Sequence, residues 1–220
     1  MKRLLLGCGI IQKELSEAIE KYDLDDLDVK WMEAGLHGEP KDLNKALQKI
    51  IDETTGYDEI ILGYGLCGNA LLGIEATNCD ILYPKTDDCI SAFMCENCRA
   101  NELRRDSYFF SRGWLEMRTD DSLTHQYDRL LEKYDEEEAE YLMSVMYGNY
   151  KRLVYLKIED EIAPEDLEKS KKYADAMNFE FVIEPATIIL YEKLILGDET
   201  YPGVERLPKG GKLTVQDFMY

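Results

Sequence analysis

Three of the six cysteines lie where an apolar run ends in glycine or aspartate and a helical pattern begins: Cys8, Cys67 and Cys89. A cysteine binds a metal or attacks an electrophile as its thiolate. In an open α/β sheet the carboxyl ends of the strands share one edge, and ligands bind in the crevice there. We therefore expect three thiols that are far apart in the sequence to meet at one metal site.

The placement of these cysteines at predicted helix starts also favours the thiolate. The positive end of a helix dipole and its unpaired backbone N–H groups both stabilise a negative charge. The alternative is that each cysteine is a small buried apolar side chain. That alternative suits Cys79 better, because it directly precedes the apolar run 80–83.

Further ligands are predicted by spacing. Two residues between cysteines let both sulfurs face one centre, as in zinc sites, iron–sulfur sites and redox pairs. His37, one of two histidines, lies in a glycine-flanked loop after a predicted strand, so it would reach the same sheet edge. The chain also contains Cys89-x5-Cys95-x2-Cys98, and the predicted metal ligands are therefore Cys8, His37, Cys67, Cys89, Cys95 and Cys98.

A glycine loop offers a different chemistry. The segment from Gly63 to Gly68 matches the Gly-x-Gly-x-x-Gly fingerprint of dinucleotide sites, follows a predicted strand and precedes a predicted helix. Asp87 and Asp88 follow about 20 residues later, where the fingerprint has an acidic residue. However, the loop follows the third predicted strand rather than the first, and Cys67 stands where a pyrophosphate would lie. Otherwise the glycines form a tight turn, which is compatible with a metal site.

The elements that would position these residues alternate between strand-like apolar runs and helical periodicity. This alternation is typical of an α/β fold with a mostly parallel sheet and helices on both faces. We expect strands at 3–6, 29–32, 59–62, 80–83 and 108–110, and helices at 15–22, 43–51 and 69–76. A long acidic helix is expected over 122–146, with a buried stripe of Leu130, Tyr134, Tyr141, Leu142 and Val145.

The remainder of the chain repeats this style. Strands are expected at 153–158, 179–183 and 213–215, and helices at 164–177 and 187–196. We predict an α/β domain over 1–150 that carries the cysteine motifs and a smaller α/β lobe over 151–220, although no linker-like composition marks the boundary.

The charge of the chain excludes several classes of partner. With 45 acidic and 26 basic residues, the net charge of −19 repels nucleic acid and anionic lipid. No run approaches the roughly 18 apolar residues that span a membrane. The short apolar start is interrupted at Gln12 and has no signal-peptide cleavage site. We expect a cytoplasmic protein with reduced cysteines.

Five segments together carry a family resemblance: Cys8 with Glu14-Leu15, Leu36-His37-x-x-Pro40, the segment 63–69, Asp88-Cys89-Ile90, and Tyr108-Phe109-Phe110-x-x-Gly113-Trp114. The chain resembles the family called domain of unknown function 1638 over most of its length, most strongly between residues 58 and 115. The resemblance implies that Cys8, His37, Cys67, Asp88, Cys89 and Trp114 are motif positions. For a bound cofactor we expect contacts from Gly63, Gly65, Gly68, Asn69, Asp88 and Trp114.

The resemblance also implies a setting near corrinoid proteins and their methyltransferases, as partners in methyl-transfer metabolism. The chain departs from the family pattern at Asp87, where histidine is expected, and at the pair Cys95 and Cys98, which replaces a segment without cysteine. The second departure suggests a subfamily with a richer metal or redox site.

The preferred interpretation is a metal-thiolate protein that binds zinc or an iron–sulfur cluster. Zinc would fit methyl transfer to a thiol, and a cluster would fit reductive activation of a corrinoid; whether the chain is an enzyme stays open. One alternative is a nucleotide or cofactor binding module that uses the glycine loop. Another is a non-catalytic partner of a methyltransferase or corrinoid protein that docks through its acidic surface and its tyrosines.

Overall fold

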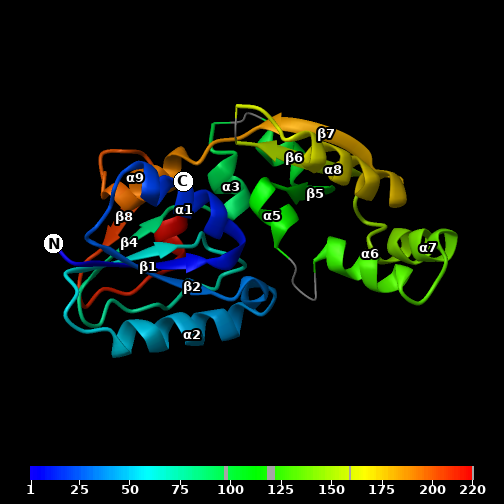
Figure 1. Cartoon of the computed structure of the whole chain (residues 1–220). Coiled ribbons are helices and arrows are strands. Elements are labelled where there is room, and N and C mark those ends of the chain that lie inside the picture. Colours follow the sequence, from blue (N-terminus) through cyan, green and yellow to red (C-terminus); the bar gives the residue numbers. More distant parts are fainter. Residues whose placement is uncertain (97–98, 118–121, 159, 220) are drawn as a thin grey trace. The chain divides into compact units, whose positions relative to one another are not determined.

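A computed structural model describes residues 1–96, 99–117, 122–158 and 160–219, except for the side chain of His37. The chain divides into two units (Figure 1): Met1–Phe93 together with Ile188–Tyr220, and Met94–Thr187. The second unit is thus one continuous segment, whereas the first is assembled from both ends of the chain.

The first unit contains a five-stranded sheet in the order β2-β1-β3-β4-β8. All five residues of β3 and all six of β1 are buried, as expected for a sheet covered on both faces. The strands are parallel except for β8, which pairs antiparallel with β4. They span Arg3–Cys8 (β1), Leu27–Met32 (β2), Glu59–Gly63 (β3), Asp80–Pro84 (β4) and Val204–Leu207 (β8).

Helices cover this sheet on two sides. Helix α2 (Pro40–Glu53) buries Leu43, Leu47 and Ile51, which lie on one helical face. Figure 1 shows α2 on the opposite side of the sheet from α1 (Gln12–Lys21) and α9 (Ile189–Leu196). The remaining helical segments of this unit are η1 (Gly9–Ile11), η2 (Ala34–Gly38), α3 (Cys89–Phe93) and η3 (Val215–Phe218).

The strand order creates a topological switch point. The chain leaves β1 in one direction to form β2 and then returns across β1 to form β3. Because such crossovers are right-handed, they place α1 and α2 on opposite faces. The crevice at the carboxyl ends of β1 and β3, where the order reverses, is where open α/β sheets bind ligands.

The second unit has a parallel sheet in the order β5-β6-β7. Its core is rich in aromatic rings: Tyr173 packs edge-on against Phe110 and Tyr127, with ring centroids 6.0 and 5.9 Å apart. The strands are β5 (Ser107–Phe110), β6 (Arg152–Lys157) and β7 (Glu180–Pro185), and the helices are α4 (Ala100–Leu103), α5 (Arg112–Glu116), α6 (Leu123–Leu131), α7 (Glu136–Met146) and α8 (Pro164–Ala176).

The predicted α/β class with a mostly parallel sheet is confirmed, but the long acidic helix is wrong. The chain breaks it into α6 and α7, and the Asp135 carboxylate accepts a hydrogen bond from the backbone N–H of Glu138 at 2.9 Å. The break changes the helical phase, so that Tyr141 and Val145 are 66% and 63% exposed, while Met143 is buried.

Two smaller predictions are also wrong. Turns over 67–73 replace the helix expected at 69–76, because Cys67, Gly68 and Asn69 have φ angles of 45°, 65° and 74° and left-handed residues do not continue a right-handed helix. No strand forms at the described residues 213–215, where Val215 begins a 3-10 helix. The last strand is instead β8, between the helix expected at 187–196 and the strand expected at 213–215.

The two units differ from the domain boundary predicted near residue 150. Strand β5 pairs with β6 across that position, and the last strand, β8, pairs with β4 of the first unit. Local composition does not reveal such long-range pairing. Within the described ranges, no helix is both long and apolar enough to cross a membrane.

Candidate functional site

Three cysteines occupy the carboxyl edge of the first unit's sheet. Cys8 is the last residue of β1, Cys67 follows β3 in a turn, and Cys89 is the first residue of α3 after β4. Since β1, β3 and β4 are parallel neighbours, all three positions share one edge. Cys8 and Cys67 flank the switch point between β1 and β3. We refer to Cys8, Cys67 and Cys89 as the thiol cluster.

Backbone contacts join the loops that carry two of these thiols. The Cys67 backbone N–H donates to the Asp87 carbonyl oxygen at 2.7 Å. Gly65 packs so closely that a Cβ there would lie 2.8 Å from the Asp88 Cα. Glycine is therefore required at this position so that the segments carrying Cys67 and Cys89 can meet. This packing is one structural reason for the glycine motif.

The pKa values of the thiols are raised by burial and by their mutual influence. Burial raises the pKa of Cys67 to about 12, and the negative charges of Cys8 and Asp88 add to the shift. Burial raises the pKa of Cys89 well above its usual value, and the charges of Cys67 and Cys8 act in the same direction. Such charge interactions weaken with distance. The shared sheet edge is what the predicted convergence requires, and the metal site itself stays a prediction.

The expectation that these cysteines are thiolates because they start helices is wrong for the structure as described. Burial also raises the pKa of Cys8, although hydrogen bonds with the Ile10 backbone and with Tyr64 oppose the shift. A run of turns follows Cys67, and α3 after Cys89 is only five residues long. Desolvation and mutual repulsion outweigh any helix dipole here, so the thiols are protonated at neutral pH.

Two tyrosines that we did not predict complete the site. The Tyr64 hydroxyl donates to the Gly7 carbonyl oxygen at 3.5 Å and hydrogen-bonds with the Cys8 thiol. The Tyr191 hydroxyl, on α9, is buried without a hydrogen-bond partner among the described residues. Burial raises the pKa of Tyr191 well above its usual value, and the charge of Cys89 adds to the shift. The thiol cluster thus lies between β-strand ends and α9.

The cysteines of the thiol cluster fit a metal by the chemistry of their sulfur donors, but their side chains, as the structure describes them, are not arranged in a coordination geometry. Within the described part of the chain, no three His, Cys, Asp or Glu side chains are arranged to hold a metal ion. In the structure as described, the thiol cluster is therefore a set of sulfur donors at one sheet edge rather than a formed metal site.

The structure does not test the other three predicted metal ligands. Cys95 is exposed and belongs to the second unit. Cys98 lies outside the described residues. His37 has its backbone in η2, and its side chain is not described. Their roles as ligands stay predictions.

The predicted cofactor contacts belong to both units. The Asp88 carboxylate accepts a hydrogen bond from the Ser91 backbone N–H at 2.8 Å, which organises the start of α3. Gly68 and Asn69 form the left-handed turn after Cys67. A Cβ at Gly63 would lie 3.3 Å from the Gly7 Cα, so this glycine lets β3 approach β1. Trp114 lies on α5 in the second unit, with its indole N–H buried and unpartnered among the described residues.

The glycine loop lacks one feature of a dinucleotide site. Residues 64–79, all described, contain turns and no helix between β3 and β4. A pyrophosphate in such a site binds at the N-terminus of the following helix. The nucleotide-binding alternative therefore stays a prediction that no described helix supports.

Comparison with known proteins gives one relationship. Searches of curated proteins and of solved structures find no match. A family model described as "Protein of unknown function (DUF1638)" matches residues 31–195, which include Cys67, Cys89 and Tyr191. Because the match covers well over half of the 220 residues, the chain belongs to this family, as the resemblance of its motifs predicted.

Proposed function

We propose that the chain is a metal-thiolate protein in which Cys8, Cys67 and Cys89 bind zinc or an iron–sulfur cluster. The observation that supports the proposal is that Cys8, Cys67 and Cys89 follow three neighbouring parallel strands at one sheet edge, two of them beside the β1/β3 switch point. Sheets of this kind bind ligands at that place, and three sulfur donors suit zinc or iron–sulfur chemistry more than magnesium or calcium.

The electrostatics of the site support a bound cation. Without one, each thiol raises the pKa of its neighbours, and burial penalises every thiolate. A metal ion reverses this balance, because its charge stabilises the thiolates and binding releases their protons. Cysteines that are at least partly buried and destabilise one another's ionised form are thus compatible with a site completed by a metal.

The backbone at Cys67 supports a specific role for this thiol. Its φ of 45° is unusual for a residue other than glycine, asparagine or aspartate. Such strain persists where the surrounding structure imposes it, commonly at functional sites. If packing alone mattered here, glycine would fit this backbone better. We infer that the side chain at this position is retained for its sulfur.

Three thiolates would leave one coordination position open. A zinc ion there would lower the pKa of a bound water or substrate thiol, whereas a cluster would carry electrons or bind a substrate at its open iron. The Tyr191 hydroxyl, buried and unpartnered among the described residues, is suited to hydrogen-bond a ligand at that position. His37 and the pair Cys95 and Cys98 stay candidate additional ligands.

The association with corrinoid and methyl-transfer metabolism is part of the proposal and rests on the family resemblance. A partner protein would need an accessible surface. Helix α7 exposes Tyr141, Val145 and Met146 beside its acidic residues, which supports docking of a corrinoid protein or methyltransferase as a second role.

The test is metal analysis with an absorption spectrum on protein purified without oxygen. The variants Cys67→Ser and Cys89→Ser remove one donor each. Cys79→Ser is the matched control, because Cys79 is also a free, buried cysteine in the first unit but is influenced by Asp80 and Glu59 rather than by the thiol cluster.

We expect stoichiometric zinc or iron in the wild type and in Cys79→Ser, and loss of the metal in both cluster variants. Absorption near about 400 nm would identify a cluster, and its absence with stoichiometric zinc would identify a zinc site. A metal-free wild type, or equal metal in all variants, would overturn the proposal.

A further inference from the structure

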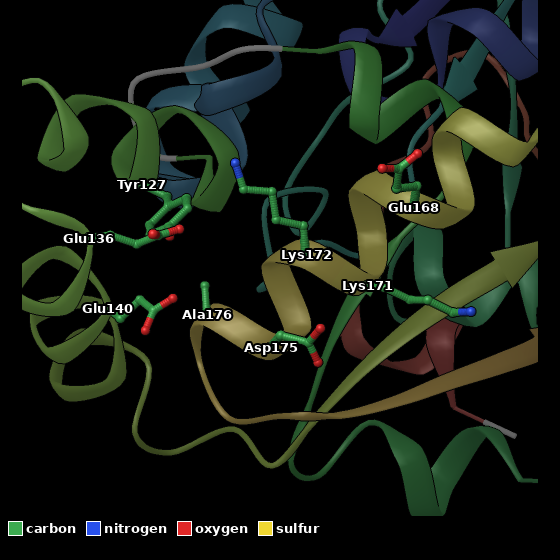
Figure 2. Close-up of a pocket in the computed structure, with 8 residues that line it drawn as sticks. All are labelled: Tyr127, Glu136, Glu140, Glu168, Lys171, Lys172, Asp175 and Ala176. Atoms are coloured by element: carbon green, nitrogen blue, oxygen red, sulfur yellow. The ribbon is translucent and has the colours of Figure 1, made fainter.

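A pocket in the second unit lies apart from the thiol cluster in sequence and chemistry. Its volume is ≈ 360 Å³, and it is formed by residues of α6, α7 and α8 (Figure 2). Small-molecule pockets start at about 300 Å³, so the space suits an organic molecule of a few carbon atoms better than a bare ion. Ala176 and the ring of Tyr127 supply apolar lining.

The charged lining is predominantly acidic. Four carboxylates line the pocket, from Glu136, Glu140, Glu168 and Asp175, against the two ammonium groups of Lys171 and Lys172. Among the described residues, these carboxylates form no ion pair with either lysine. Figure 2 shows the Lys171 side chain directed away from Tyr127, Glu136 and Glu140, whereas the Lys172 side chain extends toward the side of the view where Tyr127 lies. Near Tyr127 the two carboxylates of Glu136 and Glu140 therefore outnumber the one ammonium group of Lys172.

A buried hydroxyl marks this acidic end. Tyr127 is 1% exposed, and its hydroxyl has no hydrogen-bond partner among the described residues. Burial raises the pKa of Tyr127, and the charges of Glu140 and Glu136 add to the shift, so the hydroxyl lies near both carboxylates and keeps its proton. A buried hydroxyl without a partner is unfavourable unless a ligand completes its hydrogen bonding.

We infer that this pocket binds a small organic ammonium compound, with Glu136, Glu140 and Asp175 as counter-charges and the Tyr127 hydroxyl accepting an N–H hydrogen bond. Glu136 and Glu140 are one helical turn apart, and like charges at this spacing repel. A positively charged ligand removes that repulsion and gives the hydroxyl its missing partner. A short carbon chain would lie along Ala176 and the Tyr127 ring. This inference is independent of the proposed metal site.

The test uses 1,4-diaminobutane as the probe in titration calorimetry at low salt. Two molecules of similar length separate charge from size: neutral 1,4-butanediol and anionic succinate. The variants Glu140→Gln and Tyr127→Phe remove one charge and one hydroxyl. Glu137→Gln is the matched control, because Glu137 is exposed on the same helix and does not line the pocket.

We expect the diamine to bind the wild type and Glu137→Gln equally, and the diol and succinate not to bind. Binding should weaken about tenfold in Glu140→Gln and about threefold to tenfold in Tyr127→Phe, as for loss of a charged partner and of one hydrogen bond. Thermal melts of each variant establish that it is folded. The inference would be overturned if the diamine did not bind the wild type or if the diol bound equally well. It would also be overturned if Glu137→Gln weakened binding as much as Glu140→Gln, because that would indicate general attraction to an acidic protein.

Discussion

Substitutions at Cys67 can distinguish the effect of backbone strain from the effect of losing the sulfur. A residue with a Cβ in the left-handed region is less stable than glycine by about 1 kcal/mol, and Cys67 has a φ of 45°. We predict that Cys67→Gly has a higher free energy of unfolding than Cys67→Ala by about 1 kcal/mol. Both lack the thiol, so the comparison isolates the backbone. Urea denaturation measures the difference.

Cys8 provides a control in which alanine, rather than glycine, should give the more stable variant. It has φ −71° and ψ 131°, in the extended region, where alanine is favoured over glycine. We expect Cys8→Ala to be more stable than Cys8→Gly. If alanine were as stable as glycine at position 67, the left-handed conformation would carry no strain, and the inference that this position is retained for its sulfur would lose its support.

The two tyrosines of the site should respond oppositely to removal of their hydroxyls. Tyr191 has a buried hydroxyl without a partner among the described residues, so Tyr191→Phe should raise the free energy of unfolding by about 1 kcal/mol. Tyr64 donates to the Gly7 carbonyl oxygen, so Tyr64→Phe should lower it by a similar amount. Urea denaturation of metal-free protein measures both. Destabilisation by Tyr191→Phe would show that its hydroxyl has a partner within the protein.

At the scale of residues, the sequence indicated that the three cysteines share a sheet edge, but it gave no sign of the two tyrosines. Cys8 and Cys89 could be placed because each directly follows an apolar strand or its loop, and parallel strand ends share an edge. Tyr191 follows Cys89 by about a hundred residues, and it reaches the site only because α9 packs against α3. Phe93 of α3 contacts its ring, with centroids 5.7 Å apart. No local pattern encodes that contact.

At the scale of elements, a helix or strand could be predicted from the sequence where its own residues carry a clear periodic pattern. The stripe of Leu43, Leu47 and Ile51 predicted α2 directly, because amphipathic spacing is a local signal. The break between α6 and α7 was missed, although Asp135 followed three residues later by Glu138 resembles a helix start. Acidic residues also occur on solvated helix faces, so this signal does not by itself identify a helix start.

Strand β8 could not be predicted from its own residues. Ion pairs of one arginine on this strand help to fix it to the sheet. Arg206 on β8 contacts carboxylates of Glu59 on β3, Asp80 on β4 and Glu199, at 2.7, 3.0 and 2.7 Å. Glu59 is 2% exposed, so it depends on this cation. We predict that Arg206→Gln lowers the free energy of unfolding at pH 7 by about 3 kcal/mol, because it leaves a buried carboxylate unpaired. Lys209→Gln, which removes an exposed positive charge nearby, should have little effect.

The same cluster predicts a pH dependence. The Lys209 backbone N–H and Arg206 hold the pKa of Asp80 below its usual value, and Arg206 lowers the pKa of Glu199. Carboxyl groups with a lowered pKa stabilise the folded state above their unfolded values of about 4, and this stabilisation is lost as the pH falls through the folded values. The difference between wild type and Arg206→Gln should therefore shrink below about pH 4. A constant difference from pH 7 to pH 3 would contradict this account.

For the whole molecule, the alternation of strands and helices in the sequence was enough to predict the fold class. It was not enough to predict the division of the chain into units. A boundary near residue 150 is natural if neighbouring elements in the sequence are assumed to pair. Instead β5 and β6 pair across it, and the segment Ile188–Tyr220 completes the first unit. Because β4 and β8 are separated by more than a hundred residues, their pairing has no local signature.

The observed division into units and the predicted boundary near residue 150 predict that different fragments of the chain fold independently. The segment 94–187 contains a complete sheet, β5-β6-β7, and a core in which Tyr173 packs with Phe110 and Tyr127. A fragment of 151–220 has β6 and β7 without β5, and β8 without its partner β4. We predict that the first fragment unfolds cooperatively in urea and the second does not, because only the first keeps a closed set of buried contacts.

Circular dichroism during urea titration measures both fragments under the same conditions. A sigmoidal transition in 94–187, with a flat or gradual change in 151–220, is the expected result. The reverse would mean that the predicted boundary near residue 150 describes the folding units better. If 94–187 folds alone, the chain is an α/β unit inserted between β4 and β8 of another. The ammonium pocket and the thiol cluster can then be studied in separate pieces, since each lies within one unit.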